Sequence, residues 1–208
     1  MTGMSAPFAF DAIASSYDEG GFHREVAEKL VQGLYPVPHP ALVLDAATGT
    51  GDAAIAAVRQ LNAERVLAVD LSAAMIERAR AKSAAKDLVG RIEWRVGPAV
   101  PAPVDESSVD VVLCASSLHF LGLAALADWL RVLRPGGRLA FSLPSPDTFG
   151  PSGAFAELVA ADVALPGGVD EAAAIATAGG FEHAVAHRLE VAGDPVRVVY
   201  LCYATVPR

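Results

Sequence analysis

The stretch Leu42-Val43-Leu44-Asp45-Ala46-Ala47-Thr48-Gly49-Thr50-Gly51-Asp52 decides the fold of this 208-residue chain. A short apolar run ends in a carboxylate, passes through a turn with two glycines and opens into an alanine-rich segment. This order is typical of a buried strand, a tight loop and the start of a helix. Gly49 and Gly51 permit positive φ and a close approach of the backbone to a ligand. Because the helix start also directs free N–H groups to the same place, the stretch predicts a cradle for a small ligand.

Segments with helical and strand patterns alternate on both sides of the cradle. Residues 8–34 have a helical pattern that Gly20-Gly21 interrupts, which indicates two short helices. Further along, we expect helices over residues 52–61, 73–86 and 123–133, and strands over residues 65–70, 91–96, 109–114 and 138–143. The helix over 123–133 is expected to stop at a sharp turn, Pro135-Gly136-Gly137. This alternation predicts an α/β fold in which a doubly wound parallel sheet carries helices on both faces.

The end of the chain has a different pattern. Residues 181–191 and 196–206 are strand-like and flank the turn Gly193-Asp194-Pro195. We expect them to form an antiparallel hairpin at one edge of the sheet.

Composition excludes several classes of protein. A hydrophobic content of 53% with 19% charged residues favours a globular fold. The apolar runs are too short to span a membrane, and the N-terminus lacks the pattern of a secretion signal, so we expect a cytoplasmic protein without membrane partners. The net charge of −8 and the scattered basic residues argue against nucleic acid and for a small-molecule substrate. Cys114 and Cys202 lie in apolar runs and are expected to be buried free thiols.

The glycine turn alone leaves two ligands open. Residues 49–54 fit the pattern G-x-G-x-x-A, and Asp70 follows Gly51 by nineteen residues, where an acid can bind a ribose hydroxyl. An adenosine ribose occurs both in NAD and in S-adenosylmethionine. Asp45 discriminates between them, because a carboxylate just before the turn would repel a pyrophosphate. It can instead hold a cationic group, such as an aminoacyl ammonium, or orient a loop that does so.

Five motifs in order resemble class I S-adenosylmethionine-dependent methyltransferases, in the subgroup that modifies quinones and other small molecules (methyltransferase type 11-like). The resemblance covers nearly the whole chain. The motifs are Phe10-Asp11 with Tyr17-Asp18, residues 43–51, Val69-Asp70-Leu71-Ser72 with Met75, residues 108–120, and Leu133-Arg134-Pro135-Gly136-Gly137-Arg138-Leu139.

This resemblance implies a seven-stranded, mostly parallel sheet with the strand order 3-2-1-4-5-7-6. It implies S-adenosylmethionine as cofactor, S-adenosylhomocysteine as product and a small-molecule acceptor. The whole chain, residues 1–208, is expected to form one domain. Residues 1–35 would be a helical cap, residues 40–145 the cofactor-binding core, and residues 146–208 the substrate-side helices and the hairpin.

The resemblance also implies roles for individual residues. Asp45 and its loop would hold the methionine end of the cofactor, Asp70 would accept both ribose hydroxyls, and Tyr17 would close over the cofactor. Where the family commonly has Gly-Asp-Ala, this chain has Gly97-Pro98-Ala99, so an acid that would bind the adenine amine is missing and we expect a less specific grip on adenine. The full set of expected cofactor residues is Tyr17, Asp45, Ala46, Thr48, Gly49, Gly51, Asp70, Leu71, Met75, Pro98, Ala99 and Ala115.

Methyl transfer from a sulfonium requires alignment, and a base only where the nucleophile must lose a proton. His119 is the best candidate for a base or a contact to the acceptor, because it follows the fourth expected strand at the ligand-binding edge. His23 and Asp18 are further candidates. No cluster has metal-ligand spacing, so no metal is expected. An aromatic rim of Phe8, Phe10, Phe22, Phe149 and Phe155 is expected around the acceptor.

Two other functions stay open at this point. One is a homologue that binds the cofactor without transferring methyl, as a cyclase-like catalyst or a partner subunit. The other is an NAD-dependent oxidoreductase. The acceptor, the methylated atom and the oligomeric state are not encoded in any recognisable motif.

Overall fold

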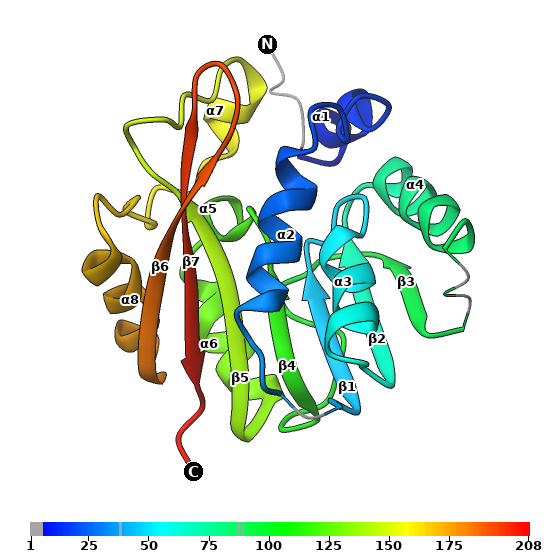
Figure 1. The fold of residues 1–208 in the computed structure, drawn as a ribbon, viewed down its shortest axis with the longest axis vertical. Coiled ribbons are helices and arrows are strands. Elements are labelled where there is room, and N and C mark those ends of the chain that lie inside the picture. Colours follow the sequence, from blue (N-terminus) through cyan, green and yellow to red (C-terminus); the bar gives the residue numbers. More distant parts are fainter. Residues whose placement is uncertain (1–5, 38, 87, 89) are drawn as a thin grey trace.

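A computed structural model of the chain describes residues 6–37, 39–86, 88 and 90–208, with the backbone alone at residues 6–8. Its centre is one seven-stranded sheet with the order β3-β2-β1-β4-β5-β7-β6 (Figure 1). This order and the antiparallel pairing of β7 with β5 and β6 confirm the expected sheet. The strands are β1 (Leu42–Ala46), β2 (Arg65–Asp70), β3 (Ile92–Val96), β4 (Val109–Cys114), β5 (Leu133–Pro144), β6 (Glu182–Val191) and β7 (Arg197–Thr205).

Most of the helices lie where the hydrophobic periodicity predicts them. The expected N-terminal pair is confirmed, as are the helices after β1 and β2 and before β5. The four-residue helix α5 is too short to produce a periodic pattern and was not expected. The helices are α1 (Ala6–Ile13), α2 (Phe22–Gln32), α3 (Asp52–Gln60), α4 (Ala73–Ala84), α5 (Leu118–Leu121), α6 (Ala124–Val132), α7 (Ala154–Leu158) and α8 (Val169–Ala178).

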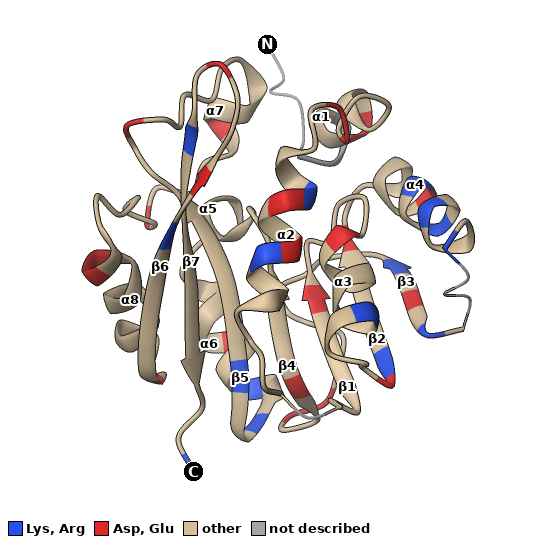
Figure 2. Cartoon of the chain, in the orientation of Figure 1, with Lys and Arg blue, Asp and Glu red and all other residues tan. Residues whose placement is uncertain are grey.

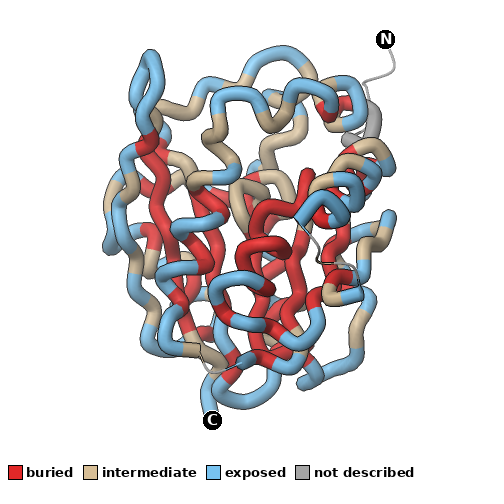
Figure 3. Tube along the Cα trace, turned by 45° about the vertical axis from the view of Figure 1, so that its right-hand side comes forward, coloured by how far each residue is buried: buried red, intermediate tan, exposed pale blue. Residues whose placement is uncertain are grey.

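The two faces of the sheet pack against different helices. Successive residues of a strand point to opposite faces. Val43 and Val111 therefore pack with the apolar residues of α2 and α3, whereas Leu44 and Val112 pack with those of α6 and α8. Every residue of β4 is buried, and Figure 3 shows burial concentrated along the central strands. This two-sided burial explains why the central strands are continuous apolar runs in the sequence.

The sequence predicts a turn at Pro135-Gly136-Gly137, but these residues are part of strand β5. The chain leaves α6 directly into β5, where Leu133 already pairs with Val109 and Arg138 pairs with Val111. Residues 134–137 bulge out opposite Asp110, whose Oδ1 lies 2.8 Å from Nε of Arg134. Burial of Leu133 and this ion pair keep the segment in the sheet, so the glycines form a bulge within one strand.

The carboxyl ends of the parallel strands meet at one edge of the sheet, where α1, α5 and α7 also lie (Figure 1). In this region α1 contacts both α4 and α7. Ser72 caps α4 by accepting a hydrogen bond from the backbone N of Met75. Loops and helix starts from distant parts of the chain are thereby brought together above β1, β2 and β4.

Candidate functional site

Asp45, at the carboxyl end of β1, ties the glycine loop to the sheet. Its carboxylate is 1% exposed and accepts hydrogen bonds from the hydroxyl of Thr48 and from the backbone N of Ala54, the latter at 2.9 Å. The backbone N of Thr48 donates to the carbonyl of Val69 in β2. Burial raises the pKa of Asp45 to about 7, and the two hydrogen bonds act in the opposite direction. A buried acid of this kind binds a proton or a cation.

The two loop glycines adopt the positive φ that the sequence predicts, +55° at Gly49 and +84° at Gly51. A Cβ at Gly51 would lie 2.4 Å from the ring of Trp94. A Cβ at Gly49 would lie 3.6 Å from the ring of Tyr17, which therefore covers this part of the loop. Only glycine satisfies both the backbone conformation and the space at position 51.

Asp70, at the end of β2, is the second acid beside the loop. Its Oδ2 accepts the backbone N–H of Gly49 at 2.8 Å, and its Oδ1 accepts that of Ser72 at 2.9 Å. Burial raises the pKa of Asp70, while these two bonds act in the opposite direction. Each oxygen keeps a further lone pair, so the carboxylate can also accept hydroxyl donors.

Asp70 lines a cavity of about 100 Å³ and is the one charged residue among the described residues that do so. Leu71 and Ala99, two of the residues expected to bind the cofactor, share this lining. Met75 is 1% exposed and does not line the cavity, and Pro98 is exposed outside it. The lining consists of Phe10, Ala47, Asp70, Leu71, Ala99, Ser117, Phe120 and Leu121.

A narrow recess of about 20 Å³ lies beside Asp45. This volume holds a group of the size of one water molecule or one ammonium. Of the residues expected to bind the cofactor, Tyr17, Thr48 and Ala115 line it, whereas Ala46 is fully buried and does not. Its lining consists of Tyr17, His23, Ala27, Asp45, Ala47, Thr48, Thr50, Asp52, Ala53 and Ala115.

A third cavity, of about 350 Å³, has five Phe side chains and Tyr17 in its lining and is here called the aromatic cavity. It shares Tyr17 and His23 with the recess and Phe10 and Phe120 with the Asp70 cavity, so the three spaces adjoin one another. The side chain of Phe8, which the sequence also places at this rim, lies outside the described residues. The aromatic cavity is lined by Phe10, Ile13, Tyr17, Phe22, His23, Ser116, His119, Phe120, Pro144, Thr148, Phe149, Gly150, Pro151, Ser152, Phe155, Arg197, Val198 and Val199.

His119, in α5, belongs to this lining but is only 3% exposed. Its ring lies 4.9 Å from that of Phe149, edge to face. Among the described residues, its buried Nδ1 has no hydrogen-bond partner. Burial, followed by the nearby His23, lowers the pKa of His119 to about 4. The imidazole is thus neutral at physiological pH and suited to hydrogen bonding.

His23, at the start of α2, stacks on Tyr17 with 4.2 Å between the ring centroids. The hydroxyl of Tyr17 lies 3.3 Å from Nδ1 of His23. Burial, followed by the charge of Arg197, lowers the pKa of His23 to about 4. Burial also raises the pKa of Tyr17. The pair is a neutral wall between the recess and the aromatic cavity.

Asp18, a further candidate for a base or an acceptor contact, lies outside the cavities. It lines none of these three cavities. Instead it accepts hydrogen bonds from Thr50 at 2.6 Å and from Lys82 at 3.0 Å, and Lys82 also contacts Asp52 at 2.9 Å. This cluster fastens the segment between α1 and α2 onto the glycine loop and α4.

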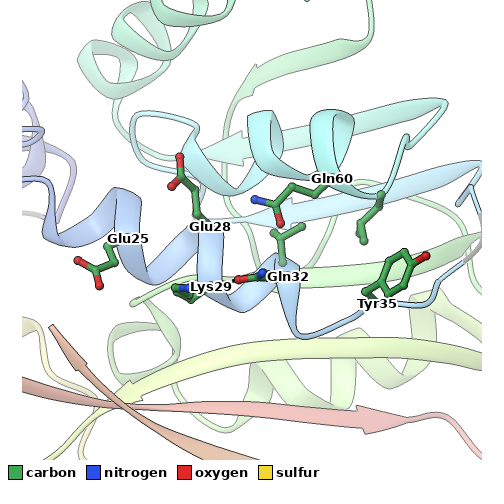
Figure 4. Close-up of a pocket in the computed structure, with 8 residues that line it drawn as sticks. Glu25, Glu28, Lys29, Gln32, Tyr35 and Gln60 are labelled. Atoms are coloured by element: carbon green, nitrogen blue, oxygen red, sulfur yellow. Dashed lines mark hydrogen bonds between the residues drawn. The ribbon is translucent and has the colours of Figure 1, made fainter.

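A separate surface groove of about 640 Å³ lies between α2 and α3 (Figure 4). Glu25, Glu28, Lys29 and Gln32 of α2 line it, and no residue of the glycine loop does. Figure 2 shows acidic and basic residues interspersed over the fold. Within the described residues, no group of three or more His, Cys, Asp or Glu side chains is placed to share a metal ion. Cys114 and Cys202 are buried free thiols, as expected.

Residues 43–137 match a methyltransferase domain family. They include the glycine loop, both acids and, apart from Phe10, the residues that line the Asp70 cavity. Together with the fold, this match shows that residues 43–137 are similar to methyltransferase domains.

Two curated relatives are similar to this domain. The ubiquinone/menaquinone biosynthesis C-methyltransferase UbiE of Dinoroseobacter shibae is 35% identical over 149 residues, which are 66% of this chain and 59% of the relative. The malonyl-[acyl-carrier protein] O-methyltransferase of Methylococcus capsulatus is 34% identical over 138 residues, which are 64% of this chain and 49% of the relative. The chain thus spans less than two thirds of the length of these relatives.

Solved structures share the fold. A chain from the Haloferax volcanii complex between the Trm112 methyltransferase activator and a methyltransferase has a TM-score of 0.72 at 20% identity, over 96% of this chain and 98% of that one. Phosphoethanolamine N-methyltransferase 2 of Haemonchus contortus, with S-adenosylhomocysteine bound, has a TM-score of 0.71 at 16% identity, over 95% and 58%. The [4+2]-cyclase SpnF has a TM-score of 0.65 at 18% identity, over 86% and 79%. The same fold therefore serves transferases and a cyclase.

Several residues of the site were not expected from the sequence. Lys82 lies on an exposed-looking helix, and nothing in its surroundings along the chain indicates a contact with Asp18. Ser117 and Leu121 follow β4 and enter the Asp70 cavity because of α5. Arg197 opens β7 and reaches the aromatic cavity. These contacts join segments far apart in the chain, and no local pattern signals them.

Proposed function

We propose that the chain is an S-adenosylmethionine-dependent methyltransferase that acts on a small molecule. The observation that supports this function best is the sequence of three adjoining cavities at the carboxyl edge of the sheet. A buried acid lies beside the narrow recess, a second acid lines the Asp70 cavity, and the aromatic cavity adjoins both. This arrangement matches a ligand with an ammonium at one end and an adenosine at the other, with the acceptor beside the sulfonium between them.

In this proposal Asp45 and its loop hold the aminoacyl end, and Asp70 accepts the ribose hydroxyls. Leu71 and Ala99 pack on adenine, without a contribution from the side chains of Met75 and Pro98. Tyr17 covers the glycine loop above the cofactor. The missing acid at Pro98 leaves adenine to apolar packing, which supports the expectation of a less specific adenine grip.

The acceptor occupies the aromatic cavity next to Tyr17 and His23. The protein contributes alignment and exclusion of water, because in-line transfer from a sulfonium needs the nucleophile close to the methyl group and directed at it. With a pKa of about 4, His119 is a weak base at neutral pH. We therefore assign it a hydrogen bond to the acceptor, and deprotonation only where the acceptor is itself acidic.

The experiment is incubation of the protein with methyl-labelled S-adenosylmethionine and a panel of quinols, phenols and carboxylic acids. The proposal is supported if a labelled product forms only when an acceptor is present and forms more slowly when Asp70 is replaced. Asp70→Asn should lower turnover at limiting cofactor by roughly tenfold to 100-fold, because hydrogen bonds to a charged group contribute about 1.5–3 kcal/mol. Asp105→Asn, in an exposed loop, is the matched control. Cofactor binding without label transfer to any acceptor would favour the cyclase-like or partner-subunit alternative.

Across the described residues, no helix has both the length and the apolar character needed to cross a membrane. We propose a cytoplasmic location, in keeping with a small-molecule acceptor and a cofactor of metabolism. Cell fractionation with detection of the chain in each fraction tests this proposal.

A further inference from the structure

Among the described residues that line the aromatic cavity, Arg197 is the one that carries a charge. The chain as a whole is acidic, with 24 Asp and Glu against 16 Lys and Arg, yet no carboxylate of the described residues lines this cavity. Within the described part of the chain, no acid lies within ion-pair distance of the Arg197 guanidinium. Arg197 is half-buried, so its charge is partly withdrawn from water with no carboxylate beside it in the described part of the chain.

The position of this guanidinium is defined by its contacts. Arg197 is the first residue of β7 and pairs with Val191 across the hairpin. Its Cζ lies 3.5 Å from the centroid of the Phe22 ring, a cation–π contact that fixes the plane of the fork. Partial burial lowers the pKa of Arg197, the direction expected for a guanidinium partly withdrawn from water. The fork is therefore held at the cavity without an anion of the chain itself.

We propose that the acceptor is a planar, largely apolar acid whose carboxylate is bound by Arg197. This inference rests on the proposed function and names the substrate class. Phenylalanine rings line the cavity and suit the planar body, and the volume of about 350 Å³ is in the range of ligand pockets. The guanidinium matches a carboxylate through two parallel hydrogen bonds. A phosphate ester fits less well, because a single cation leaves part of its double charge uncompensated in an apolar cavity.

The test uses two probes of the same shape, 2-naphthoate and 2-naphthamide, which differ in charge. Each is titrated calorimetrically into the protein with S-adenosylhomocysteine present. We expect the native chain to bind the naphthoate at least about tenfold more tightly than the amide. Arg197→Met should abolish this preference while keeping the affinity for the amide, and Arg197→Lys should retain part of it. Arg188→Gln, which removes an exposed arginine paired with Glu190 in the same hairpin, should behave as the native chain does.

The proposal is overturned by a native chain that fails to bind the naphthoate at millimolar concentration or that does not distinguish the two probes. Retention of the preference in Arg197→Met would also overturn it. The comparison of the two probes on the native chain needs no variant. It therefore still decides the question if a variant misfolds. Binding of S-adenosylhomocysteine in the same titration separates this inference from the proposed function, since loss of the carboxylate preference alone contradicts only the former.

Discussion

At the residue scale, the two acids beside the glycine loop have unlike surroundings. Asp45 is buried, bound by Thr48 and Ala54, and has a pKa of about 7. Asp70 lies at the cavity wall and is held by backbone N–H groups of Gly49 and Ser72. Because these two roles differ, we expect the two acids to affect ligand binding differently. Asp45 responds to the charge of a ligand, and Asp70 to its hydroxyl groups.

The affinity for S-adenosylhomocysteine should depend on pH through Asp45. An ammonium favours the carboxylate form, so below pH 7 binding must displace the proton that the empty site holds. With a pKa of about 7, affinity should fall by up to about tenfold between pH 8 and pH 6. Calorimetric titration across this range measures the effect. Asp45→Asn should bind more weakly with a flatter profile, and a flat profile in the native chain would contradict the role of Asp45.

His119 should make the free energy of unfolding depend on pH between its ordinary pKa of 6.5 and its folded pKa of about 4. Its folded pKa of about 4 lies below the ordinary value of 6.5, so its contribution is fully present above pH 6.5 and is lost as pH falls toward 4. Between these two pH values, His119 is protonated in the unfolded chain but stays neutral in the native chain. The free energy of unfolding should fall between pH 7 and pH 5, and this fall should be smaller in His119→Gln by about 1–2 kcal/mol. Urea unfolding at the two pH values measures it. Equal drops in the native chain and the variant would contradict this assignment.

At the element scale, the loop between β1 and α3 depends on glycine for two separable reasons. Gly51 combines a φ of +84° with a Cβ position 2.4 Å from Trp94, whereas Gly20 has a φ of +76° and no neighbour within 4 Å. Gly20→Ala should cost about 1–2 kcal/mol from backbone strain alone. Gly51→Ala should cost roughly 2–4 kcal/mol, because overpacking adds to the strain. Denaturant unfolding of both variants measures the difference, and equal costs would show that the space at Gly51 is unimportant.

The segment between α1 and α2 is held over the loop by charge. Lys82 contacts Asp18 and Asp52, and its removal takes a cation from both carboxylates and leaves Asp18 with the longer contact to Arg78 at 3.4 Å. Lys82→Met should therefore speed hydrogen exchange over residues 6–21 and weaken binding of S-adenosylhomocysteine. Lys29→Met, an exposed lysine of α2 bonded to Gln32, is the control. Unchanged exchange over residues 6–21 in Lys82→Met would show that the ion pairs do not hold this segment.

The elements that the sequence predicts well are those with a strong local pattern. The central strands are apolar on both faces, β2 ends at Asp70 and β1 ends one residue after Asp45, so their bounds are visible in the sequence. The start of β5 was missed because Pro135-Gly136-Gly137 has the composition of a turn but lies in a bulge that Asp110 stabilises. Helices α5 and α7 span four and five residues, too few for a helical period to appear.

At the scale of the whole molecule, the site was predictable where it depends on strand ends and unpredictable where it depends on packing. Adjacent parallel strands bring Asp45 and Asp70 to the same edge, and this follows from the sequence. The meeting of Phe22 with Arg197 depends instead on how α2 and the hairpin pack across the sheet. No residue spacing in the sequence indicates such a contact. The part of the site proposed to bind the acceptor could therefore be inferred only from the structure.

The central claim is that the cavities along the carboxyl edge hold S-adenosylmethionine. The most direct test is calorimetric titration of the native chain with S-adenosylhomocysteine at pH 8, where Asp45 is ionised, with Asp70→Asn beside it. We predict saturable binding at one site per chain, weakened by about tenfold or more in Asp70→Asn. Absence of binding at millimolar S-adenosylhomocysteine, with saturable binding of NAD in its place, would contradict the claim.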